Sequence, residues 1–150
     1  MIVRDLITDL VPPLKVSDTI QFGLEWMEDY KVNHLPVVDG INYLGLVPES
    51  VLLDAEDTSA ELKTIIHKFT RPIIKREQHA YDAIKLISQL GLSLLPVVNE
   101  NEELVGSITQ KSVLEKMAGI TSVQEPGGII VLQMPSVDYN LTQIAGIVET

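Results

Sequence analysis

Residues 35–39 read Leu-Pro-Val-Val-Asp, and residues 95–99 read Leu-Pro-Val-Val-Asn. The second copy of this box begins 60 residues after the first. The same offset places Pro-Pro-Leu-Lys at residues 12–15 over Pro-Ile-Ile-Lys at residues 72–75, with no gap between the two matches. A fixed offset of this length indicates a duplicated structural unit. We therefore predict two similar half-repeats in the chain.

Each half-repeat is predicted to run strand, helix, strand, strand, helix. The helical signal is clearest at Ala80, Ala83, Ile84 and Ile87, which recur at i, i+3, i+4 and i+7 and form one apolar stripe. In the first copy we expect strands at 14–16, 35–39 and 44–47, a helix that contains Ile20, Leu24 and Met27, and a helix at 49–54. In the second copy we expect strands at 73–74, 94–99 and 104–108, and helices around 80–87 and at 110–117.

The segment between the two copies gives two further expectations. Residues 54–59 are polar and acidic, which is typical of a linker. Residues 60–67 are predicted to form a helix that leads into the second copy. At the start of the first helix we expect the Asp18 carboxylate to interact favourably with the free backbone N–H groups.

The last thirty residues follow a different pattern. Residues 129–134 are apolar and largely β-branched and end at Pro135, so they predict a strand. Apolar residues within 141–148 recur at helical spacing, with Asn140 placed as the N-cap. One strand without a sheet partner is incomplete as a folded unit, so we expect this piece to belong to a larger domain or to dock on a second subunit.

Composition excludes several classes of protein. The 150 residues carry 11 Lys and Arg against 21 Asp and Glu, a net charge of −10, and this repels the phosphates of nucleic acids. There is no cysteine to form disulfides. Residues 1–10 contain Arg4 and two aspartates where a signal peptide would be apolar, and no apolar window is long enough to span a membrane. We therefore expect a cytoplasmic protein with neither a nucleic-acid nor a membrane partner.

The duplicated Leu-Pro-Val-Val box, followed each time by an apolar-Gly strand and a helix, resembles the tandem CBS-domain pair known as the Bateman module. The resemblance implies an α/β (α+β) fold of two βαββα repeats packed by pseudo-twofold symmetry, and a homodimer. It also implies a regulatory module that has no catalysis of its own. On this basis the domains are residues 1–58 and 59–119, followed by residues 120–150.

The resemblance further implies that an adenine nucleotide of the AMP, ADP or ATP class binds in the cleft between the repeats, with no cofactor required. Grooves of this kind suit phosphates, since helix N-termini point into them. In the second repeat the family pattern places Thr109 at the phosphate and Ser112 at the ribose. The remaining nucleotide-binding residues are an apolar wall of Ile73, Leu94, Leu95, Pro96 and Ile108, and the cations Arg71, Lys75 and Lys111.

Both repeats depart from the family pattern, which has an Asp for the ribose. Ser112 occupies that position in the second repeat, while the first repeat has Pro48 and Val51 at the hydroxyl and Asp positions. A plain alternative for the second repeat is that Thr109 caps the last helix and Ser112 faces solvent. The missing Asp therefore favours an alternative function, a dimerisation scaffold whose nucleotide sites have degenerated.

Residues 127–149 resemble the opening strand and helix of an ACT domain, and CBS-CBS-ACT regulatory proteins of the acetoin-utilisation type have this order. In the scaffold alternative the two repeats would then dimerise a C-terminal ACT-like ligand-binding domain. No sequence motif for nucleophilic catalysis, a P-loop or a zinc site occurs. The three histidines show no metal-ligand spacing, and we expect His34 to be a partly buried, hydrogen-bonded residue near the cleft. We therefore predict neither an enzyme nor a metal site.

Overall fold

The computed structural model of the chain describes residues 1–121. Met1–Leu114 form one compact unit, and a second unit begins at Glu115. The strand expected at 129–134, the helix expected at 141–148 and the ACT-like resemblance lie outside the described residues. The boundaries at 58 and 119 stay a prediction.

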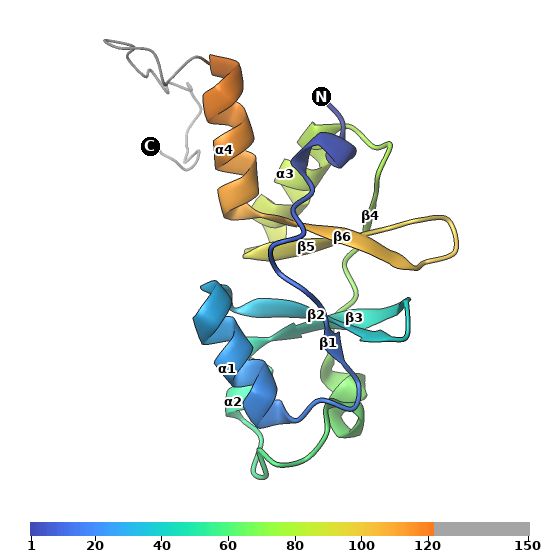
Figure 1. The fold of residues 1–150 in the computed structure, drawn as a ribbon, viewed down its shortest axis with the longest axis vertical. Helices are drawn as coiled ribbons and strands as arrows, with labels where there is room; N and C mark the ends of the chain where they lie inside the picture. Colours follow the sequence, from blue (N-terminus) through green and yellow to red (C-terminus); the bar gives the residue numbers. More distant parts are fainter. Residues whose placement is uncertain (122–150) are drawn as a thin grey trace. The chain divides into compact units, whose positions relative to one another are not determined.

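The compact unit contains two three-stranded sheets of the same topology (Figure 1). In both, the short first strand is parallel to the second, and the second and third form an antiparallel hairpin. The first repeat consists of β1 (Leu14–Lys15), α1 (Ile20–Tyr30), β2 (His34–Asp39), β3 (Asn42–Pro48) and α2 (Glu49–Leu53). The second consists of β4 (Ile74–Lys75), α3 (Ala80–Leu90), β5 (Leu94–Val98), β6 (Leu104–Thr109) and α4 (Gln110–Thr121). The predicted α/β repeat architecture is confirmed.

The two sheets share their irregularities as well as their order. The register shifts between Val37 and Val38 in the first hairpin and between Val97 and Val98 in the second. After the Leu-Pro-Val-Val box the offset between the copies rises from 60 to 61, since Gly45 corresponds to Gly106. The additional residue of the second repeat lies in the turn after β5, where the Asn99 N–H donates to the Glu103 carbonyl. The insertion thus lengthens the turn, and five residue pairs are the same in both hairpins.

The N-terminus of α1 is capped by a different residue from the one we expected. Thr19 is the N-cap of α1, and its hydroxyl accepts from the Phe22 N–H at 3.1 Å. The Asp18 carboxylate instead accepts from the Lys15 N–H at 2.8 Å and closes the turn after β1. An adjacent hydroxyl therefore takes the capping position, which short polar side chains share.

At their C-terminal ends α1 and α3 have the same backbone conformation with different residues. Lys31 has φ 59° and ψ 41° after α1, and Gly91 has φ 64° and ψ 39° after α3. This left-handed conformation is natural for glycine and unfavourable for a residue with a Cβ.

The helix expected at 60–67 is wrong in type and in bounds. A 3₁₀ segment, η2 (Leu62–Lys68), is present instead, and Ile65 inside it has non-helical dihedrals. Thr64, Ile65 and Ile66 are consecutive β-branched residues, which lose side-chain freedom in an α-helix. The backbone N–H groups of Leu62 and Lys63 bond to carbonyls in the turn after β1, which places this segment on the first repeat.

The segments that precede the two repeats are exchanged. We call residues 1–10 and 60–70 the leading segments. The first, with the 3₁₀ helix η1 (Val3–Leu6), lies along the second repeat, where Val3 N–H bonds to Gln78 and Thr8 N–H to Ser107, both at 2.8 Å (Figure 1). The second lies along the first repeat and pairs at its end with Leu46 of β3.

A glycine in each third strand permits this exchange. A Cβ added to Gly45 would lie 2.8 Å from the Thr70 carbonyl oxygen and 2.9 Å from Phe69 Cβ. At Gly106 the added atom would collide with the side chain of Ile7. The glycine of the family-like apolar-Gly strand therefore provides room for the other repeat's leading segment.

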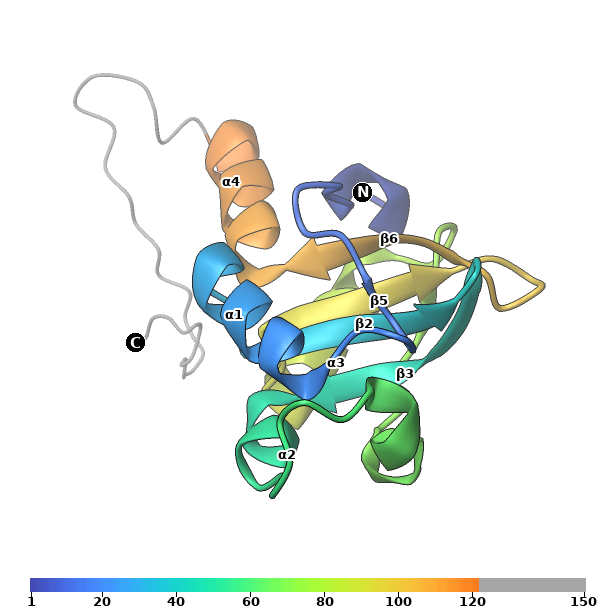
Figure 2. The same cartoon turned by 60° about the horizontal axis from the view of Figure 1, so that its bottom comes forward.

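The core runs continuously through both repeats. Leu35 and Val37 of β2 and Leu95 and Val97 of β5 are fully buried. Figure 2 shows β2 and β5 as neighbouring strands at the centre of the unit, which places the two Leu-Pro-Val-Val boxes at the junction of the sheets. The beginnings of β2 and β5 thus meet at a place that both repeats form.

Candidate functional site

The junction of the repeats carries a small polar cluster at the starts of β2 and β5, which we call the seam cluster: Asn33, His34 and Ser93. The Ser93 hydroxyl accepts from the Asn33 N–H at 3.1 Å and lies 2.9 Å from His34 Nδ1. The Ser93 N–H also donates to His34 Nδ1, at 3.1 Å. Asn33 and Ser93 occupy the same position in the two repeats, one residue before each strand.

The hydrogen bonds of the seam cluster determine the protonation of His34. A backbone N–H can only donate, so Nδ1 must be an acceptor and the ring proton lies on Nε2. Burial lowers the pKa of His34 below its ordinary value of 6.5, which favours this neutral form. The expectation that His34 is partly buried and hydrogen-bonded is confirmed.

A cleft of about 260 Å³ opens beside His34. It lies between the end of the first repeat's sheet and the segment that leads into β4. Four of its lining residues are apolar and two, His34 and Thr70, are polar. The lining consists of His34, Pro48, Thr70, Pro72, Leu90 and Leu92. We call this the His34 cleft.

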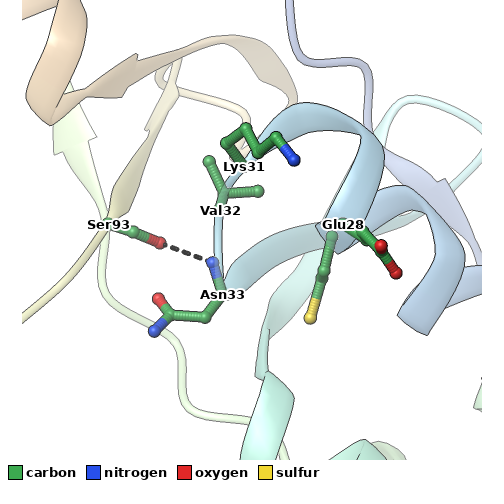
Figure 3. A pocket seen from close by; sticks show the side chains of 6 residues that line it. Glu28, Lys31, Val32, Asn33 and Ser93 are labelled. Carbon is green, nitrogen blue, oxygen red and sulfur yellow. Dashed lines mark hydrogen bonds between the residues drawn. The ribbon is translucent and has the colours of Figure 1, made fainter.

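A second, larger depression of about 420 Å³ lies on the other side of the seam cluster, at the end of α1 (Figure 3). Its lining is charged as well as polar, with Glu28 and Lys31 from the end of α1 and Asn33 and Ser93 from the seam. The dashed line in Figure 3 marks the Asn33 to Ser93 hydrogen bond at its edge. Both depressions therefore border the junction of the repeats.

The two hydroxyls expected at the nucleotide lie together, and each bonds to the backbone of the other residue. Thr109 Oγ accepts from the Ser112 N–H, and Ser112 Oγ accepts from the Thr109 N–H, both at 3.0 Å. This reciprocal pair caps the start of α4. Thr109 is 8% exposed. Neither side chain of this pair lines the His34 cleft.

The expected apolar wall lies mostly inside the protein. Four of its members are buried in the core, namely Leu94, Leu95, Pro96 and Ile108. Ile73 is half-buried, on the segment that leads into β4. Of this set, Ile73 is therefore the residue with side-chain surface to offer to a ligand.

The three expected cations lie on different segments of the chain. Arg71 bonds to Glu102 at 2.5 Å and to the Tyr43 carbonyl at 3.2 Å, and its guanidinium lies 5.2 Å from the Tyr43 ring centroid. This contact joins the turns of the two hairpins. The half-buried Lys75 lies in β4, and the exposed Lys111 in the first turn of α4.

Sequence reasoning missed Asn33 and Ser93, although a signal was present. Both immediately precede the duplicated strand at an offset of 60, and in both copies the apolar Leu-Pro-Val-Val box begins two residues later. Within residues 1–121 no cluster of three His, Asp or Glu side chains could hold a metal ion. In the same part of the chain no helix is long and apolar enough to cross a membrane.

Comparison with known proteins agrees with the geometry. Residues 63–119 match the CBS domain family. The structure of a CBS domain pair/ACT domain protein from Thermotoga maritima is 25% identical, covers 80% of this chain and 98% of its own, and superimposes with a TM-score of 0.68. The structure of CBSX2 in complex with AMP is also 25% identical, covers 79% and 97% of the two chains, and has a TM-score of 0.64.

A curated relative, inosine-5'-monophosphate dehydrogenase from Korarchaeum cryptofilum, is 33% identical over 75% of this chain. The match covers 22% of that enzyme, and the chain spans less than a quarter of the first curated relatives it matches. The second repeat is therefore similar in sequence to a CBS domain, and the two repeats together have the fold of a CBS-domain pair.

Proposed function

We propose that this protein is a regulatory module that binds an adenine nucleotide between its two CBS repeats. The observation that carries the proposal is the junction itself, where two repeats of one fold meet at a seam cluster flanked by two depressions. A ligand at such a junction contacts both repeats, so its binding favours the arrangement of the two repeats for which its affinity is higher. Support comes from CBSX2, a structural neighbour that was solved with AMP.

In this proposal the phosphate is held near the second repeat. It binds either to Lys111 with Thr109 and Ser112 at the start of α4, or to Arg71 or Lys75 at the opposite end of the β5–β6 hairpin. The Arg71 to Glu102 ion pair is exposed, with 41% and 56% of the two side chains accessible. Exposed pairs contribute little free energy, about 0–1 kcal/mol, so a phosphate can replace the carboxylate at small cost. Arg71 would then exchange one anionic partner for another.

The alternative function is a homodimeric scaffold with degenerate nucleotide sites. The specific observation in its favour is that the Thr109 and Ser112 hydroxyls already bond to backbone groups at the start of α4, while the first repeat has Pro48 and Val51 at these positions. In both functions the module regulates rather than catalyses, resides in the cytoplasm and binds no nucleic acid. The alternative requires a dimer in sedimentation at micromolar concentration.

Titration calorimetry with AMP, ADP and ATP tests the nucleotide proposal. We expect at least one of them to bind and to raise the melting temperature, because a ligand of the folded state stabilises it. Arg71→Gln should weaken this binding about fivefold or more, in line with a hydrogen bond to a charged group. Arg4→Gln is the matched control, since Arg4 also forms an exposed ion pair, with Glu77 at 2.6 Å. Absence of heat and of any thermal shift with all three nucleotides would contradict the proposal.

A further inference from the structure

We propose that Asp39 is a modification site, which isomerises without an enzyme to isoaspartate, and that this change loosens the contact between the two hairpins. The inference goes beyond the proposed function, since it involves no ligand. Asp39 and Gly40 lie at the tip of the β2–β3 hairpin, at the end of β2 that is opposite to the seam cluster. They form the one Asp-Gly or Asn-Gly dipeptide of the sequence.

The reaction requires a carboxyl group that the next backbone nitrogen can reach. The Gly40 nitrogen forms a bond to Cγ of the protonated Asp39 carboxyl, whose OH leaves as water with the amide proton of Gly40. Water then opens the resulting five-membered succinimide ring. When it breaks the bond between the nitrogen and the main-chain carbonyl carbon, the backbone continues through the side-chain carbonyl and gains a methylene group. One water is lost and one is regained, so the composition is unchanged and no oxidant or reductant is needed.

The hairpin tip leaves both reacting groups accessible. Asp39 pairs with Asn42, so the turn contains only Gly40 and Ile41, and all four residues are exposed. Gly40 has φ 67°, and the space that a Cβ would occupy there is open. Within residues 1–121 no hydrogen bond or ion pair holds the Asp39 carboxylate, and the Gly40 N–H donates to no acceptor. The ring can therefore close after a local opening of the tip, without unfolding of the sheet.

The equivalent turn of the second repeat is protected. Asn99 occupies the position of Asp39, and its Oδ1 accepts from the N–H groups of Asn101 and Glu103 at 2.9 and 3.0 Å. Its Nδ2 donates to the Glu103 carboxylate at 2.9 Å. The residue that follows is Glu100, whose side chain hinders access to the backbone nitrogen, where the first repeat has a glycine. Asn99 is therefore a reference position within the same chain.

The tip that would be modified also joins the two repeats. The Leu104 N–H donates to the Ile41 carbonyl at 3.0 Å, and the Tyr43 N–H donates to the Glu102 carbonyl at 3.2 Å. The two hairpins are thus bonded backbone to backbone. A further methylene group in the backbone after Asp39 shifts the Ile41 carbonyl relative to Leu104, so we expect the hydrogen bond between them to be lost.

Incubation of the whole chain at 37 °C and pH 6 for four weeks tests the site. An isoaspartate-specific methyltransferase and peptide mass spectrometry then locate the product. We expect isoaspartate at Asp39 and none at Asn99. Asp39→Glu keeps the charge but would require a six-membered ring, so it should give no product at this position. Asp39→Asn should react faster than the unmodified chain, because an amide is attacked more readily than a carboxylate, with release of ammonia.

Hydrogen exchange measures the consequence for the contact between the hairpins. In the isomerised chain the Leu104 amide should exchange about threefold faster or more, in line with the loss of one hydrogen bond. The Leu46 amide, which donates to the Thr70 carbonyl at 2.7 Å, is the control and should be unchanged. Isoaspartate at Asp39 in guanidinium chloride but not in the folded chain would overturn the inference, because the hairpin would then protect this residue. Equal exchange of Leu104 before and after isomerisation would overturn the proposed effect on the contact.

Discussion

The two repeats have one topology, and several of the residues that differ between them lie around their junction. Pro48, Lys31 and His34 of the first repeat correspond to Thr109, Gly91 and Leu94 of the second. The buried strand positions are apolar in both, apart from Ser107 and Thr109 of β6. The comparison teaches that the shared apolar pattern determines the architecture, whereas the residues at the strand and helix ends set the chemistry of each half.

The largest expected effect tests the glycines of the third strands. Gly45→Ala should destabilise the protein by about 3 kcal/mol, because the new Cβ would meet the Thr70 carbonyl, which the backbone holds in place. Gly106→Ala should cost only about 1 kcal/mol, since the side chain of Ile7 can turn away. Urea unfolding midpoints at constant m-value measure both.

The double variant Gly106→Ala with Ile7→Ala sharpens this comparison. It should recover part of the loss caused by Gly106→Ala, because the two sites are in contact and couple in a double-mutant cycle. A loss at Gly106 as large as that at Gly45, with no coupling to Ile7, would show that the two leading segments are not held as described.

The C-terminal ends of α1 and α3 provide a smaller test. Gly91→Ala should cost about 1 kcal/mol, because its φ of 64° is unfavourable for a residue with a Cβ. Lys31→Gly should stabilise the protein, because glycine adopts the same backbone conformation without strain. The gain should be less than about 1 kcal/mol, because glycine also raises the entropy of the unfolded chain. The two changes exchange the residues of the two repeats, and thermal unfolding reports their opposite signs. A loss of stability for Lys31→Gly would mean that the Lys31 side chain contributes more than its backbone costs.

The smallest expected effect concerns pH and distinguishes His34 from Leu94. Because burial lowers the pKa of His34, the unfolded state binds more protons than the folded state below about pH 6.5. His34 therefore reduces stability as the pH falls through this region and has no such effect above it. His34→Leu should unfold at a urea midpoint that varies less between pH 7.5 and 5.5 than that of the unmodified chain. Identical pH profiles would show that burial does not lower the pKa of His34.

Much of this fold could be predicted from the offset alone. The bounds of α1 and α3 differ by 60 residues, as the alignment of Leu24 with Ile84 and Met27 with Ile87 implies. The exchange of the leading segments could not be predicted, because the apolar Val3 and Leu6 would be buried equally well on either repeat.

The candidate site was predicted less completely than the fold. The nucleotide-binding set stays a prediction. Four of its five apolar residues are core residues, which the sequence did not indicate because apolar patterns do not reveal which face a ligand can reach. The reciprocal bonds of Thr109 and Ser112 depend on the geometry of the start of α4. The contribution of Ser93 depends on a contact across 59 residues of chain, which local patterns do not encode.

The exchanged leading segments also bear on how such a chain could have arisen. A single half of this protein would carry a leading segment that its own repeat does not receive. Two such halves could satisfy each other by trading these segments, as in domain swapping between identical subunits. Fusion of the two genes would preserve every contact and would allow Pro48 and Thr109, once the same residue, to diverge. Two identical short chains would have to carry the same residue at both positions. The asymmetry of the present junction therefore requires that both repeats lie in one chain.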